Sequence, residues 1–377
     1  MASNAKNLAE LLNQDSTVAA GDVADGSITT AKLAADAVTA AKLADNAVVT
    51  ANIVDGNVTA VKTTGVDKGK NLLINGEHKV SQRGTSFSGQ GANGGPYFTD
   101  RWYCYSGGTS AGRFTATQEA INDLPGFTTA LKLDCTTADT SIGADEQLSL
   151  IQAVEAQNLQ RLKFGTSDAV PLTYSFYAKA NAAKTYIAEL YAIDGTAKSQ
   201  SHAFNVTTSW QRFEITFSAT GANAATINND TGVGLYVNIN IHAGSNLTSG
   251  TINSTWAAAT QANRMVGCGS FYSSTANTFF MTGAQLEVGA TATDFDYEDI
   301  GTTLRKCQRY HISMTCSAGA DYQTNGANIP LGNGFHFPTT MRATPTGTVV
   351  SNVAAQNTNS GTLAYLDVHG GRYHCNQ

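Results

Sequence analysis

The chain has 377 residues, a formal net charge of −6 at pH 7 and only 14% charged residues. Its length suffices for two or three domains, and its acidic balance leaves no basic stripe for nucleic-acid binding. No apolar run approaches the roughly 18 residues of a membrane-spanning helix, so we expect neither nucleic acid nor a membrane as partner. The beginning of the chain also lacks the hydrophobic core of a secretion signal, which predicts assembly in a cytoplasm.

The first predicted element is a short amphipathic helix over residues 4–13. Leu8, Leu11 and Leu12 fall on one face of this helix. A helix of about three turns is only marginally stable alone in water. We therefore expect residues 1–20 to dock on another protein through these three leucines.

Residues 21–60 repeat every ten residues as GDVADGSITT, AKLAADAVTA, AKLADNAVVT and ANIVDGNVTA. The aliphatic side chains recur every five residues, a spacing that walks around a helix and alternates faces in a strand. We therefore expect residues 21–66 to form a thin fibrous stalk in which several copies of the chain bury these side chains along a shared axis. A disordered linker and a continuous helix are the alternatives. The stalk positions are Ile28, Leu33, Val38, Leu43, Val48, Ile53 and Val58.

Between residues 67 and 300 the pattern changes to alternating apolar and polar residues, which is typical of strands. The segments PLTYSFYAKA, SWQRFEITFSA, VGLYVNINIH and FFMTGAQLEVG each place their large apolar residues on one face. Only residues 153–163 indicate a helix. The fold class predicted is mainly β, with an antiparallel sandwich or jelly-roll head. The Gly-, Asn- and Thr-rich residues 301–377 then predict a small β tip.

The segments NLLINGEHKVSQRG, FTDRWY, EQLSLIQAVEAQNL and FFMTGAQLEVGATATDFDYEDIGTTLRKCQRYH resemble phage tail-fibre and virion structural proteins. The decads resemble the stalk repeats in front of such heads, and the head resembles carbohydrate-binding-module jelly rolls. The resemblance covers nearly the whole chain and implies a virion fibre, typically a homotrimer. It also implies attachment to a bacterial surface glycan and to other tail, baseplate or capsid proteins, the latter through the N-terminus. It carries no defined set of binding residues.

Two other functions compete with receptor binding. A structural capsid or baseplate protein would share the fold and bind no receptor, and a glycan depolymerase would add catalysis. Residues 108–112, GTSAG, match the nucleophile-elbow pattern around Ser110. That motif needs a helix after the serine, whereas the strand-like RFTATQ follows. We therefore expect a hairpin loop here, and a protein that is not an enzyme.

One strand offers the residue types that a sugar site needs. Sugars stack their apolar faces on aromatic rings, while polar side chains bond their hydroxyl groups. In VGLYVNINIH, Tyr236, Asn238 and His242 lie opposite the aliphatic residues, so we predict that this row faces solvent and binds sugar. Tyr177 could join from a neighbouring strand, and Trp256 lies in a loop. The alternative is that the row packs against another protomer.

Metal binding is considered at two places, and no organic cofactor is predicted. The segment DFDYED places Asp294, Asp296 and Glu298 on one face of a predicted strand. Carboxylate oxygens suit Ca²⁺, but a solvated strand edge explains these residues equally well. The C-terminal HGGRYHC could hold a transition metal on a three-fold axis, or form a surface turn.

Overall fold

The computed structural model describes residue 24 and residues 26–33, 70–313, 331–347, 360–364 and 366–376. The chain divides into two units, Met1–Val66 and Asp67–Gln377. In the first unit, the described residues include a short 3-10 helix, η2, over Thr30–Lys32. Among the residues with described structure, no helix is long and apolar enough to cross a membrane.

The predictions for the docking helix and for most of the stalk fall outside the described residues. This applies to Leu8, Leu11 and Leu12, and to the stalk positions from Val38 to Val58. Ile28 and Leu33 are described, and their side chains are 58% and 45% exposed in the single chain. Two exposed aliphatic residues at a spacing of five are compatible with burial between copies, but the stalk stays a prediction.

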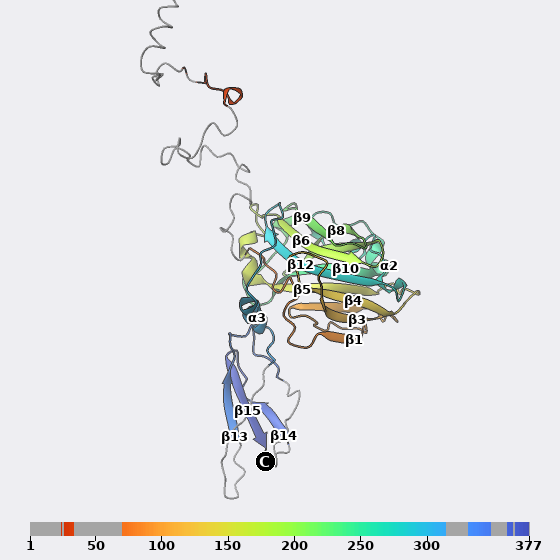
Figure 1. Cartoon of the computed structure of the whole chain (residues 1–377), viewed down its shortest axis with the longest axis vertical. Helices are drawn as coiled ribbons and strands as arrows, with labels where there is room; N and C mark the ends of the chain where they lie inside the picture. Colours follow the sequence, from red (N-terminus) through yellow and green to blue (C-terminus); the bar gives the residue numbers. More distant parts are fainter. Residues whose placement is uncertain are drawn as a thin grey trace, which may run out of the picture. The chain divides into compact units, whose positions relative to one another are not determined.

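Two six-stranded antiparallel sheets make up most of the second unit (Figure 1). Sheet A has the order β1-β3-β4-β12-β6-β9, and sheet B has the order β11-β8-β7-β10-β5-β2. The strands of sheet A are β1 Ser86–Gln90, β3 Arg113–Ala120, β4 Thr129–Thr137, β6 Leu172–Ala180, β9 Gln211–Phe217 and β12 Thr278–Val288. Those of sheet B are β2 Trp102–Gly107, β5 Gln147–Glu155, β7 Lys184–Ala192, β8 Lys198–Val206, β10 Val233–Ala243 and β11 Ala257–Ala258.

The hydrophobic core lies between the two sheets, which confirms the predicted antiparallel sandwich. Rings from opposite sheets meet there: Phe176 of β6 lies 5.1 Å from Phe204 of β8, measured between ring centroids. Because strand side chains alternate between faces, each central strand gives every second residue to this core. The buried faces predicted from sequence are confirmed for Leu235, Val237, Ile239 and Ile241 of β10, and for Leu172, Tyr174, Phe176 and Ala178 of β6.

Short helices connect the strands of the sandwich. The helix expected over residues 153–163 is a 3-10 helix that begins only after β5 ends. The other short elements precede or follow β10 in the chain. These helices are η6 Ala156–Leu162, η7 Ala222–Ala224, α2 Ser245–Thr248, η8 Gln261–Asn263 and η9 Phe271–Ser273.

One α-helix and a third sheet follow the sandwich. Helix α3, Ile300–Gln308, was not predicted from the sequence. Asp299 starts it, because its carboxylate accepts hydrogen bonds from the backbone amides of Gly301 and Thr302 at 2.9 and 3.2 Å. The third sheet is antiparallel with the order β13-β15-β14. Its strands are β13 Leu331–His336, β14 Ser360–Ala364 and β15 Gly370–Asn376.

Candidate functional site

Sheet B turns one face toward the core and the other toward a surface rich in tyrosine. On β10, Tyr236 lies on this outer face and pairs with Tyr191 of β7 across the ladder. Their rings are stacked, with centroids 6.3 Å apart and an interplanar angle of 26°. The guanidinium of Arg264 lies over the Tyr191 ring, 4.4 Å from its centroid. The outer face therefore carries aromatic rings that neighbouring side chains hold in place.

Two more tyrosines continue this surface toward the edge strand β2. The rings of Tyr97 and Tyr103 lie 5.1 Å apart, and the side chain of Tyr103 interacts with that of Tyr236. Burial raises the pKa of Tyr103, and the neighbouring tyrosine adds to the rise, so its hydroxyl stays protonated at neutral pH. Tyr97 remains 37% exposed. We call Tyr97, Tyr103, Tyr236 and Tyr191 the tyrosine row.

The predicted sugar-binding role of Asn238 assumed that this residue faces solvent, which is wrong. Asn238 lies on the outer face but is only 2% exposed. Its amide donates to Glu189 at 2.9 Å, and Glu189 also accepts hydrogen bonds from Nε and Nη2 of Arg264 at 2.7 and 2.9 Å. Burial opposes the charge of Arg264, yet Glu189 raises the pKa of this guanidinium. Asn238 therefore belongs to a buried polar cluster beside the tyrosine row.

His242 is also buried, again contrary to the prediction of a solvent-facing row. Its Nδ1 lies 2.9 Å from Ser270 Oγ, and its Nε2 lies 3.0 Å from Glu146 Oε2. Tyr272 packs on its ring at 4.9 Å. Burial lowers the pKa of His242, although Glu146 opposes the shift. The residues after β10 cover this end of the strand, so His242 holds the cover in place and cannot touch a sugar.

The two aromatic residues predicted to join the row do not lie on it. Tyr177 belongs to β6 of sheet A, where its ring contacts Phe127 at 5.1 Å. Trp256 is 4% exposed and packs edge-on against Phe164 at 5.0 Å. Burial of a large apolar ring stabilises the fold, and Trp256 is therefore a core residue rather than a free loop residue.

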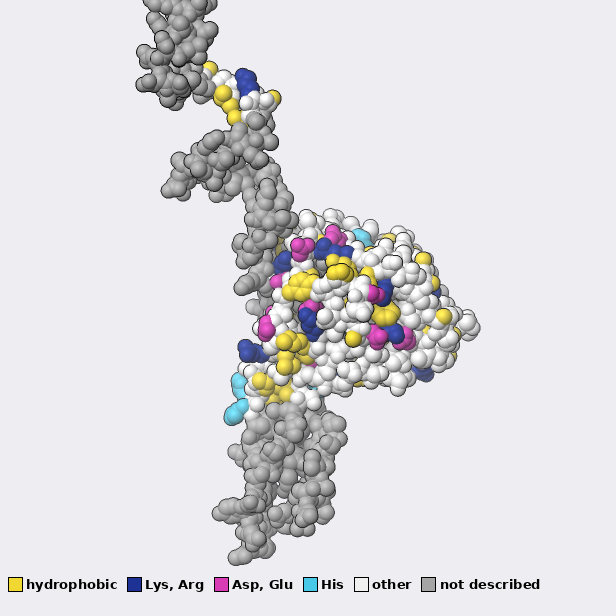
Figure 2. All heavy atoms as spheres, viewed as in Figure 1, with side chains coloured by type: hydrophobic (Ala, Val, Ile, Leu, Met, Phe, Trp, Pro, Cys, Tyr) yellow, Lys and Arg dark blue, Asp and Glu magenta, His cyan; other side chains and the backbone are white. Residues whose placement is uncertain are grey.

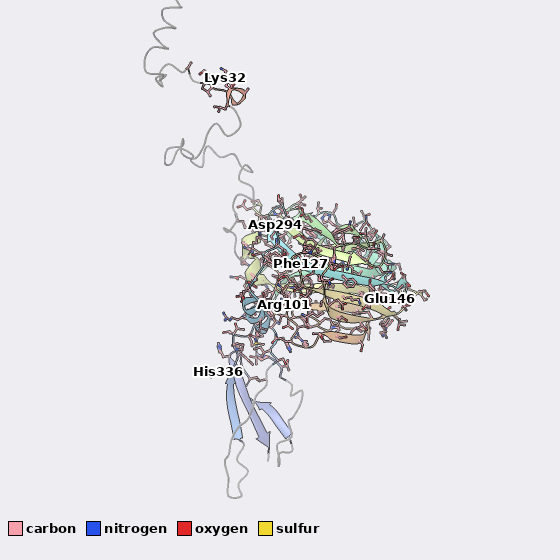
Figure 3. The ribbon with its side chains drawn as sticks, in the orientation of Figure 1. Lys32, Arg101, Phe127, Glu146, Asp294 and His336 are labelled. Atoms are coloured by element: carbon pink, nitrogen blue, oxygen red, sulfur yellow. The ribbon has the colours of Figure 1, made fainter. Side chains whose placement is uncertain are left out.

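A second aromatic cluster lies on the outer side of sheet A. Phe127 contacts the rings of Tyr177, Phe295 and Tyr297 at 5.1, 5.3 and 5.6 Å, and Tyr297 is 54% exposed. Figure 2 shows hydrophobic side chains interspersed with charged ones on the face in view, and Figure 3 marks Phe127. This cluster is separated from the tyrosine row by the whole thickness of the sandwich.

The three acids considered for calcium lie in an irregular connection between β12 and α3, not in a strand. Glu298 forms an ion pair with Lys306 and accepts a hydrogen bond from Thr303 at 3.1 Å. The backbone at Asp294 and Asp296 is bound by Gln285 of β12 at 3.2 and 2.8 Å. Within the described ranges, no three His, Cys, Asp or Glu side chains group in a way that could hold a metal ion.

The segments GTSAG and HGGRYHC lie in structural surroundings that differ in part from those expected. Residues 108–112 connect β2 of sheet B to β3 of sheet A, so they form no hairpin. Ser110 is buried, and its hydroxyl donates to Asp139 at 3.0 Å. Strand β3 follows it, as predicted, instead of the helix of a nucleophile elbow. Near the C-terminus, His369 is exposed, while the rest of HGGRYHC belongs to β15.

A pocket of about 140 Å³ lies beside the tyrosine row. Tyr97 lines it, and so does Ala153 of β5, the residue that pairs with Tyr236 on β10. The guanidinium of Arg101 stacks on the Tyr310 ring at 3.4 Å, and Figure 3 shows Arg101 on the side of the sandwich near α3. The pocket is lined by polar and charged side chains that include Arg83, Tyr97, Arg101, Glu155, Tyr310 and Arg342.

Several residues of this surface were missed from the sequence alone. In FTDRWYCYSG, Trp102 and Cys104 are buried in the core, so the alternating Tyr103 and Tyr105 must face outward. This alternation is visible in the sequence and is the local signal that indicates an outward-facing Tyr103. Arg264 carried no such signal, because it lies in an irregular connection whose path depends on tertiary contacts.

No family model matches the chain, and no match was found among curated proteins. Solved structures with similarity include the enzymatically active domain of tailspike protein 4 from bacteriophage CBA120. That comparison covers 58% of this chain and 21% of the other, with 13% identity and a TM-score of 0.31. The chain thus spans about a fifth of the length of that tailspike domain.

Carbohydrate-binding modules are also among the similar structures. A family 4 module is matched over 57% of this chain and 97% of its own length, with 13% identity and a TM-score of 0.29. A family 11 module from Clostridium thermocellum, in complex with a β-1,3-1,4-mixed-linked tetrasaccharide, is matched over 55% of this chain and 98% of its own. Its identity is 12% and its TM-score 0.27.

Proposed function

We propose that this chain is a non-enzymatic virion fibre protein whose head binds a glycan on a bacterial surface. The observation that carries the proposal is the tyrosine row on the outer face of sheet B. Tyrosine rings offer apolar faces for the C–H side of a sugar, and their hydroxyls can bond its polar groups. Tyr97 and the neighbouring Tyr105 are 37% and 43% exposed, so part of this surface is open to a ligand.

The tyrosine row is pre-organised, which reduces the entropic cost of binding. Arg264 lies over Tyr191, and Glu189 fixes that guanidinium through two hydrogen bonds. Tyr103 contacts the ring of Tyr97 and interacts with the side chain of Tyr236. Exposed rings contribute little to the stability of the fold. A sugar site, in contrast, benefits from aromatic rings whose orientation is fixed before binding.

The virion role rests on the decad repeat and on the resemblance of the chain to tail-fibre proteins. In this proposal residues 21–66 join the copies into a homotrimer, and residues 1–20 attach them to the tail, baseplate or capsid. We expect each single sugar site to bind weakly, with a dissociation constant in roughly the millimolar range, or about −4 kcal/mol. Several heads on one fibre would raise the apparent affinity through their high effective concentration.

A structural virion protein without a receptor is the second candidate, favoured by the aromatic cluster around Phe127. Interfaces between proteins are enriched in Tyr and Phe, and Tyr297 is 54% exposed in the single chain. If that cluster holds another protein, the head could be a connector. The two candidates use opposite faces of the sandwich and can be tested separately.

The test of glycan binding is adsorption of the full chain to bacteria and to an array of bacterial glycans. Tyr236→Ala should lower the apparent affinity about tenfold, as truncation of a central aromatic residue does at binding sites. Tyr297→Ala is the matched control, because it removes the same side chain from the opposite face. Melting temperature and solution mass should be unchanged in both variants.

Two outcomes would contradict the proposal. If Tyr236→Ala adsorbs normally while folded, the tyrosine row does not bind the receptor. If instead only Tyr297→Ala changes the assembly of particles and no glycan binds the wild type, the structural candidate is correct. Release of reducing ends from a bound glycan would contradict the non-enzymatic part.

A further inference from the structure

The pocket beside the tyrosine row contains a buried arginine that forms no ion pair within the part of the chain that is described. Arg101 is only 6% exposed. Its Nη2 donates to the carbonyl of Ala153, and its guanidinium stacks on Tyr310. Its Nε is buried and has no hydrogen-bond partner among the described residues. Burial lowers the pKa of Arg101, as expected for a cation removed from water.

The acids of this pocket are engaged by other residues. Asp100 lies 3.5 Å from Arg83 Nη1. Glu155 accepts hydrogen bonds from Nε and Nη2 of Arg309 at 3.0 and 2.9 Å, and another from the hydroxyl of Tyr310. Glu155 therefore acts on Arg101 only as a more distant charge.

Arg342 adds a second cation at the same place. Its side chain is exposed, and its Nη1 donates to the backbone carbonyl of Thr231 at 2.9 Å. No ion pair of Arg342 occurs among the described residues. The pocket and its surroundings therefore contain four arginines but only two carboxylates, those of Asp100 and Glu155. Arg83 and Arg309 pair with these carboxylates, so the excess positive charge lies on Arg101 and Arg342.

We propose that this pocket binds an oxyanion, a carboxylate or a phosphate, through Arg101 and Arg342. A planar guanidinium recognises both groups with charge-assisted hydrogen bonds, and a bound anion would compensate the buried cation. The volume of about 140 Å³ exceeds what a single water molecule needs.

The position of the pocket also indicates which larger ligand carries the anionic group. Ala153 lines the pocket and pairs with Tyr236, and Tyr97 both lines the pocket and contacts Tyr103. A sugar chain stacked on the tyrosine row would therefore carry its acidic substituent to Arg101. This identification of the ligand as an acidic glycan rests on the glycan-binding function proposed above, whereas the anion site itself does not.

The test uses the full chain and three probes at constant ionic strength: sodium glucuronate, inorganic phosphate and neutral glucose. Binding is measured by calorimetry. We expect the two anions to bind the wild type and glucose to bind at least about fivefold more weakly, because a hydrogen bond to a charged group contributes more than a neutral one. The better of the two anions distinguishes a uronic-acid glycan from a phosphate-bearing one.

Arg342→Gln should weaken binding of the preferred anion at least about fivefold without a change in melting temperature, because this side chain is exposed. Arg305→Gln is the matched control: it removes the same charge from an exposed position on α3 outside the pocket. Arg101→Lys keeps the charge but loses the planar fork, so it should also weaken binding. If Arg101→Lys does not fold, Arg342→Gln still decides the question.

Equal binding of glucose and glucuronate by the wild type would overturn the anion pocket. So would equal losses in Arg342→Gln and Arg305→Gln, because the effect would then be one of net charge. A different result would contradict only the glycan-binding proposal. In that case Tyr236→Ala would bind bacteria normally, while phosphate would still bind the pocket in a manner that depends on Arg342.

Discussion

His78 shows how a single buried side chain can make the stability of the head depend on pH. Its Nδ1 lies 2.8 Å from Thr99 Oγ1, while its Nε2 is buried without a partner among the described residues. Burial lowers the pKa of His78 from 6.5 to about 3. The folded state therefore binds fewer protons than the unfolded state between these two values, so stability should fall as the pH drops.

The first prediction follows from this shift. Between pH 7 and pH 4, protonation of His78 in the unfolded state should cost the head on the order of 3 kcal/mol of unfolding free energy. In His78→Gln this contribution is absent, so its unfolding free energy should change less over the same range. Urea unfolding at several pH values measures both slopes, and identical slopes in the two proteins would contradict the assignment.

The burial of individual polar residues was not predictable from the sequence, although the faces of their strand were. The alternation in VGLYVNINIH correctly separated the aliphatic face of β10 from its polar face, because strand periodicity is a local property. The covering of Asn238 and His242 by residues 264–272 is not local. It depends on Glu189, Glu146 and the path of a connection without periodicity, and no pattern in β10 indicates it.

Helix α3 brings several residues of the anion pocket to the sandwich, where Ala153 and Glu155 of β5 supply others. Tyr310 and Arg309 follow directly after its last residue, Gln308. Only Thr303 and Cys307 of this helix are buried, so little apolar packing holds it. Its shortness explains why the helix was missed. Ile300, Leu304 and Cys307 follow a helical spacing and Asp299 can cap the helix, but a nine-residue segment with Gly301, Thr302 and Thr303 in its first turn is a weak helical signal.

The second prediction concerns this cap. Asp299→Ala removes the acceptor of two backbone hydrogen bonds and should cost about 1 kcal/mol of helix stability. Hydrogen exchange of the α3 amides should become faster, while the strands of the sandwich keep their protection. Asp299→Asn is the control because it can still cap. If the amides of α3 exchange equally in all three proteins, the cap does not hold the helix.

At the scale of the whole molecule, the sequence predicted a mainly β protein with an antiparallel sandwich, and this is confirmed. Each of the four quoted segments contains a strand. The stalk differs, because each ten-residue unit of its sequence is too small to bury its own apolar residues and needs stacked neighbours or other chains. Ile28 and Leu33 are exposed in the single chain, and the shared-axis prediction is that other copies of the chain cover them.

The last prediction is that the copies associate through the five-residue apolar spacing. Leu33, Val38, Leu43 and Val48 are large side chains at consecutive positions of this spacing. Full burial of each contributes about 1.5–3 kcal/mol, and every copy contributes its own set. Replacing all four by serine should therefore dissociate the oligomer, and sedimentation should report a single-chain mass instead of a multiple, with three copies expected.

The control variant also carries four serine substitutions, but at positions outside the five-residue apolar spacing. Changing four alanines of the same decads removes little apolar surface, so this variant should keep the oligomer mass. The positions for the control are Ala34, Ala41, Ala44 and Ala47.

Equal dissociation of both variants would mean that the repeat associates through its overall composition, and an unchanged mass in both would mean that the stalk has no role in assembly. Only dissociation confined to the Leu and Val variant supports a shared apolar axis, because only that variant alters the side chains at the five-residue spacing.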